Sequence, residues 1–514
     1  MQTSPHRVST GRAVLALDEG TTGTRAGLVL EDGAARHVRY RAIEVDHPGD
    51  LLVEQDPMEI WGATLDVARQ ALGLAHRDGI TVTAVALSTQ RATAVLWDSA
   101  TGLPLLPAVV WQDRRHAAEL AVRAAGWDDQ LMRRQGRPVG SRSPFLWAAR
   151  QIAGHREVAA AHRAGRLRFG TVDTWLMWHL TGGSVHATTP TNAASTGGYL
   201  LTEHAWDEEW IDALGFPLDL LPRLLADDAE FGASDPSVLG VRVPVAASMG
   251  DQHAALVALG GLAAGQGMGM FGTGAFVDAA TGPVPALPRP GIAGVVAQPG
   301  RRQGDTTHYS LEAYTSTVGS ALRWLCEDLR LFASPGELGE AAANATGRPG
   351  TGPRFVPAFA GVRTPRWRPG ATAALTGLTL ATTRADLARA VLDGIAHSVC
   401  DLVDGVAGTL GAPLSRLRVG GGVSGSDPLM QTQADLTGLA VERVADSATA
   451  SLRGTAYLAG VAQGLWTCLE EVVEAQPRGR TFEPALGGAD RAALRADWRS
   501  VLDHHLDTPG PTPH

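Results

Sequence analysis

The sequence predicts an α/β protein of two domains. Its 514 residues exceed the roughly 250–300 residues at which a single hydrophobic core stops growing. Apolar, strand-like segments alternate with segments of helical periodicity, as in sheets covered by helices. A strand, a turn rich in Gly and Thr, and a second strand occur at 13–30 and again at 268–282. This repeat indicates two halves of related design that meet near 255–265, so we predict domains 1–258 and 259–514.

The first half opens with a hairpin pattern. Ala13–Leu17 and Ala26–Leu30 are apolar, the polar segment Thr21–Thr24 separates them, and Asp32-Gly33 signals the next turn. Further strands are predicted at Val82–Leu87, Ala94–Trp97 and Val243–Ala247. Apolar residues at helical spacing predict helices over 58–76, 114–125 and 145–161.

The second half repeats the pattern. An apolar run from 268 is followed by Gly272-Thr273-Gly274 and by the apolar segment Ala275–Ala280. Helices are predicted near 315–331, 384–408, 428–438 and 449–464, and a strand at Leu417–Val419 precedes a triple glycine. The Pro-rich residues after 507 are expected to be disordered.

Composition excludes several classes of protein. The formal net charge of −9 argues against a nucleic-acid partner, which normally meets a basic face. The chain contains no Lys, so a Walker P-loop, a protein-kinase site and Schiff-base chemistry all lack their essential residue.

Cysteine usage and hydropathy indicate a cytoplasmic protein. The three cysteines are far apart and have neither metal-ligand nor disulfide spacing, which favours a reducing compartment. The first dozen residues are polar and do not resemble a signal peptide. No apolar run reaches the ~18 residues of a membrane span, so no membrane association is expected.

The segment from Asp18 to Arg25 is the first candidate site. A carboxylate at a strand end, followed by Gly and Thr residues, brings backbone N–H groups and hydroxyls together. Such a concavity binds phosphate without Lys, while Asp18 can hold Mg²⁺ through water. The alternative is an ordinary hairpin in which Thr serves β-propensity.

Two loops in the second half carry related signals. Gly272-Thr273-Gly274 is a tight turn by itself, but paired with the first turn it suggests a phosphate held between two facing hairpins. Gly420–Gly425 fits G-x-G-x-x-G, with Glu442 about 20 residues further on, so a dinucleotide site is one alternative. Fewer than 100 residues follow it, which is too few for a dinucleotide fold. We therefore favour a loop whose backbone lies close to an adenosine.

Asp251 is the candidate general base. It ends an apolar strand and begins a helix, so it can be an N-cap, a base for a substrate hydroxyl, or both. Gln90-Arg91 and the segment 111–115 combine polar side chains with Trp111 and could hold a polyol. A solvated charge run is the simpler interpretation of 113–115.

Taken in order, these segments resemble the FGGY carbohydrate kinase family, and within it most closely the glycerol kinases. The resemblance runs from residue 13 to about 485 and rests on ALDEGTTGTRAG, VEQDPMEIW, STQRATAVLWDSATGLPL, VVWQDRR, FGTVDTWLMWHLTGG, SMGDQHAAL, FGTGAF, VPAFAGVRTPRW, LRVGGGVSGSDPLMQTQAD and TAYLAG. The resemblance implies a ribonuclease-H-like fold of the actin and sugar-kinase superfamily with an interdomain cleft. It also implies Mg-ATP as phosphoryl donor and a small polyol or sugar as acceptor, and it is compatible with a homodimer or homotetramer.

The resemblance also implies roles for single residues. Asp18 would serve the metal and Asp251 would be the base. Phosphate and nucleotide would be bound by Thr21, Thr22, Arg25, Gly272, Thr273, Gly319, Arg323, Gly422 and Ser426. The acceptor would be held by Arg91, Trp111, Asp251, Gln252 and Phe276.

This chain departs from the glycerol kinases around the acceptor. They carry Glu where this chain has Ala92, and a substrate-contacting Tyr in the segment that matches 137–145, which here contains Arg142 and no Tyr. On the nucleotide side, Arg323 and Ser426 replace Gln and Asn. Ala92 leaves room for an acceptor longer than glycerol. Alternatives are a kinase for a ketose such as xylulose or ribulose, and an ATPase of the same superfamily that phosphorylates no sugar.

Overall fold

The computed structural model describes residues 11–289, 291–347 and 350–507, and the chain forms two compact units. The first unit comprises 1–258, 298–309 and 449–476, and the second comprises 259–297, 310–448 and 477–514. The predicted division at 258 and 259 is the first crossing between the units. The prediction differs from the structure in two later segments, 298–309 and 449–476, which belong to the first unit. The prediction for the tail after 507 lies outside the described residues.

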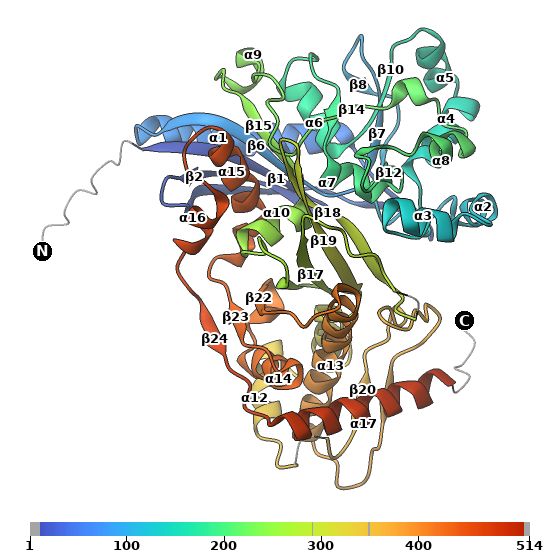
Figure 1. The fold of residues 1–514 in the computed structure, drawn as a ribbon, viewed down its shortest axis with the longest axis vertical. Coiled ribbons are helices and arrows are strands. Elements are labelled where there is room, and N and C mark those ends of the chain that lie inside the picture. The colour runs from blue at the N-terminus through green and yellow to red at the C-terminus, as the bar shows by residue number, and fades with distance from the viewer. Residues whose placement is uncertain (1–10, 290, 348–349, 508–514) are drawn as a thin grey trace, which may run out of the picture. The chain divides into compact units, whose positions relative to one another are not determined.

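A five-stranded sheet of order β15-β6-β1-β2-β3 forms the centre of the first unit (Figure 1). Its strands are β1 (Arg12–Gly20), β2 (Gly23–Leu30), β3 (Ala35–Ala42), β6 (Thr81–Thr89) and β15 (Val245–Gly250). β1 and β2 form the predicted hairpin, and β1, β6 and β15 run parallel to one another. Their carboxyl ends, where Asp18, Thr89 and Gly250 lie, therefore meet at one edge of the sheet.

Helices cover both faces of this sheet. Helix α1 (Pro57–Arg77) packs on the face that carries Leu15 and Leu17, and α15 (Ala450–Ala462) packs on β6 and β1. The start of α1 is fixed by Asp56, whose side chain accepts from Met58 N, with Pro57 in the first turn. Each fully buried leucine contributes roughly 1.5–3 kcal/mol.

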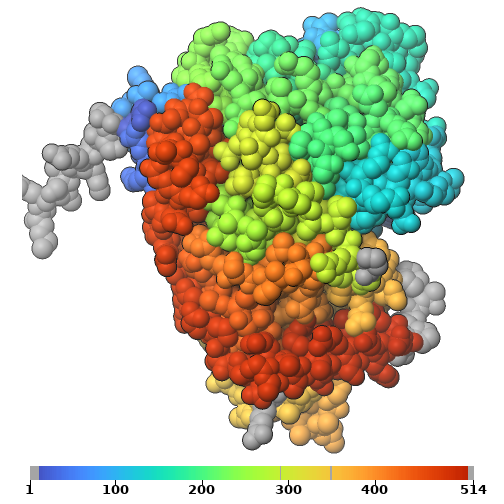
Figure 2. Space-filling model, viewed as in Figure 1, coloured from blue at the N-terminus to red at the C-terminus, as the bar shows by residue number. Residues whose placement is uncertain are grey.

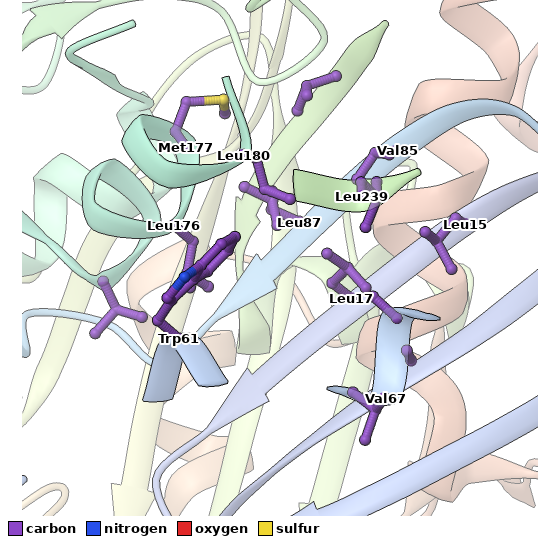
Figure 3. Close-up of a cluster of buried hydrophobic side chains, with 14 of the residues drawn as sticks. Leu15, Leu17, Trp61, Val67, Val85, Leu87, Leu176, Met177, Leu180 and Leu239 are labelled. Atoms are coloured by element: carbon purple, nitrogen blue, oxygen red, sulfur yellow. The ribbon is translucent and has the colours of Figure 1, made fainter. Parts of the chain in front are cut away.

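The larger hydrophobic core of the first unit joins β1, β6, α1 and α6 (Val172–Leu180). Figure 3 shows how side chains from these elements meet: Leu15, Leu17, Trp61, Val67, Val85, Leu87, Leu176, Met177, Leu180 and, from α9, Leu239.

A second sheet in this unit has the order β10-β7-β9-β5-β4, with β8 paired to β7. Its strands are β4 (Asp46–Gly49), β5 (Leu52–Gln55), β7 (Ala94–Asp98), β8 (Leu103–Pro104), β9 (Ala108–Val109) and β10 (Leu167–Thr171). The remaining strands are β11 (Ala187–Thr188), β12 (Tyr199–Leu200), β13 (Ala205–Trp206) and β14 (Arg223–Leu224). The other helices of the unit are α2 (Ala117–Arg123), α3 (Asp128–Gln135), α4 (Pro144–Gly154), α5 (Arg156–Arg163), α7 (Pro190–Ala193), α8 (Glu208–Ala213), α9 (Pro236–Leu239), α10 (Asp251–Ala258) and α16 (Leu469–Glu474).

A seven-stranded sheet has the order β18-β19-β17-β16-β22-β23-β24; its strands belong to the second unit except for residues 298–309 of β18 and β19, which belong to the first. The strands are β16 (Gln266–Phe271), β17 (Ala275–Gly282), β18 (Val295–Gln303), β19 (Thr306–Thr315), β22 (Arg416–Gly420), β23 (Val441–Arg443) and β24 (Arg480–Phe482); β20 (Arg354–Val356) and β21 (Ala374–Thr376) form a separate pair. In this sheet the hairpin β16–β17 is extended by β22 and β23, which run parallel to β16. In the first unit the hairpin β1–β2 is extended in the same way by β6 and β15. The predicted repetition of design is therefore present in the strand order.

The helices of the second unit are α11 (Gly319–Arg323), α12 (Pro335–Ala343), α13 (Arg384–Leu410), α14 (Asp427–Thr437) and α17 (Gly488–Asp507). α13 begins with a capping box of Thr383 and Asp386 and ends at Gly411, which has a φ of 80°. α17 forms the red band along the surface of this unit in Figure 2 and buries Trp498 against His397 of α13.

Two predicted helices differ from the structure. The helix predicted over 145–161 is broken at His155, whose backbone is extended between α4 and α5. The helix predicted over 315–331 is shorter, because β19 continues to Thr315 and a π-helical turn, Trp324–Asp328, follows α11. Among the described residues, no helix is both long and apolar enough to cross a membrane.

Candidate active site

The turn between β1 and β2 is held rigid by donors from three directions. Thr21 and Thr22 lie between the paired residues Gly20 and Gly23. The Thr21 carbonyl accepts from Gln55 Nε2 at 2.7 Å, and the Thr22 carbonyl accepts from Ile43 N and from the Tyr40 hydroxyl. A Cβ on residue 23 would lie 2.5 Å from the Tyr40 hydroxyl oxygen, so a larger residue there would displace the Tyr40 side chain. These hydrogen bonds hold the turn in place.

Asp18 lies at the base of this turn. Its carboxylate accepts from Ser88 Oγ at 3.1 Å, and Arg25 NH1 lies 3.6 Å from its other oxygen. Burial raises the pKa of Asp18 to about 6; the charge of Arg25 lowers it and that of Asp251 raises it. The predicted metal residue, the predicted phosphate-binding Arg25 and the predicted base thus share one electrostatic environment.

Glu19, next to Asp18, received no predicted role. Its side chain is fully buried, Oε2 accepts from Thr64 Oγ1 at 3.2 Å, and Oε1 has no hydrogen-bond partner among the described residues. Burial raises the pKa of Glu19 to about 8, so at neutral pH this carboxyl is mostly protonated. Its position at the end of an apolar strand was the signal that could have drawn attention to it.

Asp251 is the first residue of α10, directly after β15. Its Oδ1 accepts from Gln252 N at 2.8 Å, and Arg91 Nε lies 3.5 Å from the same oxygen. Asp251 therefore begins the helix, and this position is compatible with the base role that we propose for it. A Cβ on Gly454 of α15 would overlap the Ala254 carbonyl oxygen, so that glycine permits α15 to hold α10 in place.

Arg91 passes over Gly250 on its way to Asp251. A Cβ at position 250 would lie 2.7 Å from Arg91 Cδ and 2.9 Å from His253 Nδ1, so a side chain there would displace one of these groups. Arg91 NH1 also donates to Gln298 Oε1 at 3.3 Å, which belongs to the same unit. Ala92, buried beside it, has a φ of 62°, a conformation that non-glycine residues adopt rarely.

Trp111 connects the turn to a further arginine. Its indole N–H donates to Thr21 Oγ1 at 2.9 Å, and the Arg142 guanidinium lies 5.9 Å from the ring centroid. The Trp111 backbone N–H donates to Thr93 Oγ1, two residues beyond Arg91. The first unit thus brings together the predicted acceptor residues Arg91, Trp111, Asp251 and Gln252. Phe276 lies on β17 in the second unit, where its ring stacks on Tyr314.

A buried chain of amides beneath this site was missed. Thr93 Oγ1 donates to Gln90 Oε1, Gln90 Nε2 donates to Gln55 Oε1, and Gln55 reaches Thr21. Gln55 and Gln90 are each 1% exposed. Gln90 was predicted as a polyol contact, but both ends of its amide are occupied by protein, so it positions the turn instead.

The interpretation of 113–115 as a solvated charge run holds for the exposed Arg114 but not for Asp113 and Arg115. Asp113 is 4% exposed and accepts from Val53 N at 2.8 Å, and Arg115 binds both Asp113 and Glu54. This ion-pair group fastens the segment after Trp111 to β5.

In the second unit, the turn Gly272–Gly274 is joined to the start of α11. Gly319 N donates to the Gly272 carbonyl at 3.0 Å, and Val318 N and Ser320 N donate to the Thr273 carbonyl. A Cβ on Gly274 would overlap the Thr315 carbonyl oxygen, and one on Gly319 would lie 2.6 Å from the Gly272 carbonyl oxygen. Gly272, Thr273 and Gly319 therefore form one local structure. Arg323, at the end of α11, is exposed.

The loop after β22 lies beside it. A Cβ on Gly319 would lie 3.1 Å from Val423 Cγ2, and one on Gly422 would meet nothing within 4 Å. Ser426 caps α14. Arg443 NH1 donates to the Ser424 and Gly425 carbonyls and to Asp427 Oδ1 at 3.1, 3.2 and 2.8 Å. The backbone of 422–425 is thus braced from behind and open at Gly422.

The dinucleotide alternative for this loop is not supported. It requires Glu442 to bind a ribose, but Glu442 Oε2 accepts from Arg418 Nε at 3.0 Å in a largely buried ion pair. Asp18 is the residue of this site that would hold Mg²⁺. Among the described residues no group of three or more His, Cys, Asp or Glu side chains is placed to hold a metal, but Mg²⁺ commonly needs only one or two carboxylates plus substrate phosphates.

Comparison with known proteins agrees with this geometry. Residues 13–258 match the N-terminal domain and residues 267–463 the C-terminal domain of the FGGY family of carbohydrate kinases. The glycerol kinases of Symbiobacterium thermophilum and Thermus brockianus are 38% and 39% identical over 500 and 494 residues, which cover 95% of this chain and 97% and 98% of theirs.

Solved structures agree as well. The Plasmodium falciparum glycerol kinase with ADP has a TM-score of 0.90 at 25% identity, covering 97% of this chain and 99% of that one. A xylulose kinase from Lactobacillus acidophilus shares the fold, with a TM-score of 0.81 at 20% identity over 96% of this chain and 97% of its own. Fold and site together define a two-domain α/β phosphotransferase of the sugar-kinase type. The chain belongs to the FGGY family of carbohydrate kinases, and it is an ATP-dependent kinase.

Proposed function

We propose that this kinase transfers the γ-phosphoryl group of Mg-ATP to a terminal hydroxyl of a small polyol, either glycerol or a somewhat longer one. The observation that carries the proposal is the contact of Arg91 with Asp251 at the carboxyl edge of the first sheet, where Asp18 and the Thr21–Thr22 turn also lie. The names of the glycerol kinases that match nearly the whole chain support it.

In this proposal Asp251 accepts the proton of the attacking hydroxyl. A bond forms between that oxygen and the γ-phosphorus while the bond from the γ-phosphorus to the bridging oxygen of ADP breaks. Arg91, held by Asp251 and Gln298, donates to acceptor hydroxyls. Gln252 and Phe276 are also assigned to the acceptor. The Trp111 face packs against the acceptor's C–H groups.

The phosphate and nucleotide groups are assigned to loops of each unit. Thr21, Thr22 and Arg25 hold phosphate oxygens in the first unit, as Gly272 and Thr273 do in the second. Gly319, Arg323, Gly422 and Ser426 hold the rest of the nucleotide. Asp18 is the carboxylate that would hold Mg²⁺, which supplies positive charge to the phosphates when bound.

The three free cysteines, Cys326, Cys400 and Cys468, support a cytoplasmic location.

A panel of acceptors in a coupled ADP assay tests the proposal. Glycerol, erythritol, xylitol, xylulose and ribulose are compared by kcat/KM, and the product is checked for a phosphate ester by ³¹P NMR. Ester formation from a polyol supports the proposal. A ketose preferred over every polyol replaces it with the ketose alternative, and ADP release that is independent of any acceptor replaces it with an ATPase.

A further inference from the structure

A cluster of buried polar side chains adjoins the carboxyl edge of the first sheet. Thr89 ends β6, the residues Thr189, Thr191 and Asn192 lie at the start of α7, and Asp227 follows β14. All five side chains are fully buried, and the proposed transfer uses none of them. Buried polar groups are costly unless they are hydrogen-bonded, so the partners of this cluster indicate what it holds.

The Asp227 carboxylate joins two separate parts of the first unit. Its Oδ1 accepts from Thr191 Oγ1 and its Oδ2 accepts from Arg302 N of β18, each at 2.6 Å. The backbone adds two further bonds, because Ser248 N of β15 donates to the Asp227 carbonyl and Asp227 N donates to the Arg302 carbonyl, each at 2.9 Å. Asp227 therefore fastens β15, β18 and the start of α7 to one another.

The Thr191 hydroxyl extends this connection to the proposed base. Its single proton is directed at Asp227, which leaves its lone pairs to accept a hydrogen bond. Gly250 N donates to Thr191 Oγ1 at 3.2 Å. Gly250 is the last residue of β15 and Asp251 is the first residue of α10. The bond from Gly250 to Thr191 therefore fixes the backbone directly before Asp251.

Strand β18 extends the connection to Arg91. Gln298 of β18 accepts from Arg91 NH1 at 3.3 Å, and Arg91 Nε lies 3.5 Å from Asp251 Oδ1. Arg302, whose N–H binds Asp227, lies further along the same strand. The two side chains that contact Arg91 are thus carried by the two segments that Asp227 fastens together.

The strand that leads to Arg91 is bound to the same cluster. Thr89 Oγ1 donates to Asn192 Oδ1 at 3.1 Å, and Asn192 Nδ2 donates to Thr189 Oγ1 at 3.0 Å. The Thr189 and Thr191 hydroxyl oxygens lie 3.4 Å apart. One buried network therefore contacts the ends of β6 and β15, from which the proposed acceptor and base residues project.

From these contacts we infer that Asp227 and Thr191 are positioning residues of the transfer, which hold Asp251 and Arg91 in register. They act through the backbone of Gly250 and through β18. The inference rests on the proposed function, because it concerns the placement of the proposed base and of a proposed acceptor residue. Loss of either positioning residue should therefore impair use of the acceptor and leave the binding of ATP unchanged.

Thr191→Val and Thr191→Ser test the inference in the full-length protein, with glycerol and erythritol as acceptors. Val preserves the volume but leaves the Gly250 N–H without this acceptor, whereas Ser preserves the hydroxyl. Misplacement of a reacting group by about 1 Å can cost about 10² in rate. We expect Thr191→Val to lower kcat/KM for each acceptor by about this factor, with KM for ATP within about twofold of wild type. Thr191→Ser should restore kcat/KM to within about threefold of wild type.

Thr188→Val is the matched control for a loss of stability alone. Thr188 Oγ1 also donates at 2.6 Å to a buried carboxylate, that of Asp173 in α6, whose other oxygen accepts from Thr171. Urea unfolding should show comparable losses of stability for Thr188→Val and Thr191→Val. Only Thr191→Val should lose turnover of the acceptor.

Asp227→Asn provides a second, independent variant. An amide has one acceptor oxygen, so Thr191 and Arg302 N cannot both keep their acceptor. We expect kcat/KM for the acceptor to fall by about tenfold or more. In the double variant with Thr191→Val the loss should not exceed that of Thr191→Val by more than about threefold, because both changes break one connection.

The outcomes separate this inference from the proposed function. Wild type that forms a phosphate ester, together with a Thr191→Val variant of near-wild-type kcat/KM, would overturn the inference alone. Equal losses of turnover in Thr188→Val and Thr191→Val, a parallel rise in KM for ATP, or losses that multiply in the double variant would also overturn it. Wild type that phosphorylates neither glycerol nor erythritol would overturn the proposed function, and the inference with it.

Discussion

Arg91 Nε lies 3.5 Å from Asp251 Oδ1, although the two residues are far apart in the sequence. The contact is possible because the parallel strands β6 and β15 end at the same edge of one sheet. It places a cation beside the carboxylate that we propose as the base.

Replacement of Asp251 by Asn should abolish turnover. The amide keeps the shape and the helix start but cannot accept the proton, so we expect kcat to fall by about 10²–10⁴-fold. Binding of ATP, measured by isothermal titration calorimetry, should change little. Asp235→Asn is the control, since Asp235 caps α9 and Asn caps equally well. Near-wild-type turnover of the Asp251→Asn variant would remove Asp251 from the mechanism.

Gly250→Ala should damage the acceptor side selectively. The added Cβ would lie 2.7 Å from Arg91 Cδ, so Arg91 must move away from Asp251. Displacement of a positioning group by about 1 Å can cost about 10² in rate, and we expect kcat/KM for the acceptor to fall by this order while KM for ATP stays within about twofold. Gly73→Ala, where a Cβ on α1 meets nothing within 4 Å, should retain activity. Equal losses on both substrates would indicate general unfolding.

Glu19 should make stability depend on pH. Its pKa is about 8 in the folded protein and 4.5 ordinarily, so between these values the folded state binds more protons than the unfolded state. The free energy of unfolding therefore decreases as pH rises through this window, by on the order of 1 kcal/mol per pH unit from this group. In Glu19→Gln the decrease should be smaller, and the variant should be more stable than wild type at pH 8.5.

Urea unfolding at pH 5.5 and 8.5 measures this effect. Asp18, with a pKa of about 6, and Asp227, with a pKa of about 7, contribute with the same sign, so part of the pH dependence remains in the variant. Glu474→Gln, at an exposed position on α16, is the control and should follow wild type. The explanation is wrong if Glu19→Gln and wild type lose the same stability between the two pH values.

Arg443→Gln should weaken nucleotide binding. The arginine donates to the Ser424 and Gly425 carbonyls and so holds the backbone of the loop that contains Gly422. Loss of these bonds should raise KM for ATP by about tenfold, which corresponds to ~1.4 kcal/mol, with KM for the acceptor unchanged. Arg384→Gln, which removes a surface ion pair with Glu337 in the same unit, is the control. A change in acceptor KM alone would contradict the assignment.

Local sequence patterns were sufficient to predict the strands, turn and helix start that carry the candidate site. The apolar run Ala13–Leu17, the Gly and Thr turn after it and the strand-to-helix transition at Asp251 all appear in the structure where they were predicted. These features depend on residues that are close together in the sequence, and their propensities agree with the final fold. The break at His155 was missed because apolar spacing continues through it.

The chain by itself thus determined the α/β class, the two related hairpins and most of the candidate groups, since hydrophobic periodicity and turn chemistry are local properties. Only the tertiary structure decided what each polar side chain contacts. Gln55 and Gln90 became a buried support for Thr21, Asp113 and Arg115 a buried ion pair, and Arg142 a neighbour of Trp111. Contacts between residues far apart in sequence depend on which strand ends meet, and no single segment contains that information.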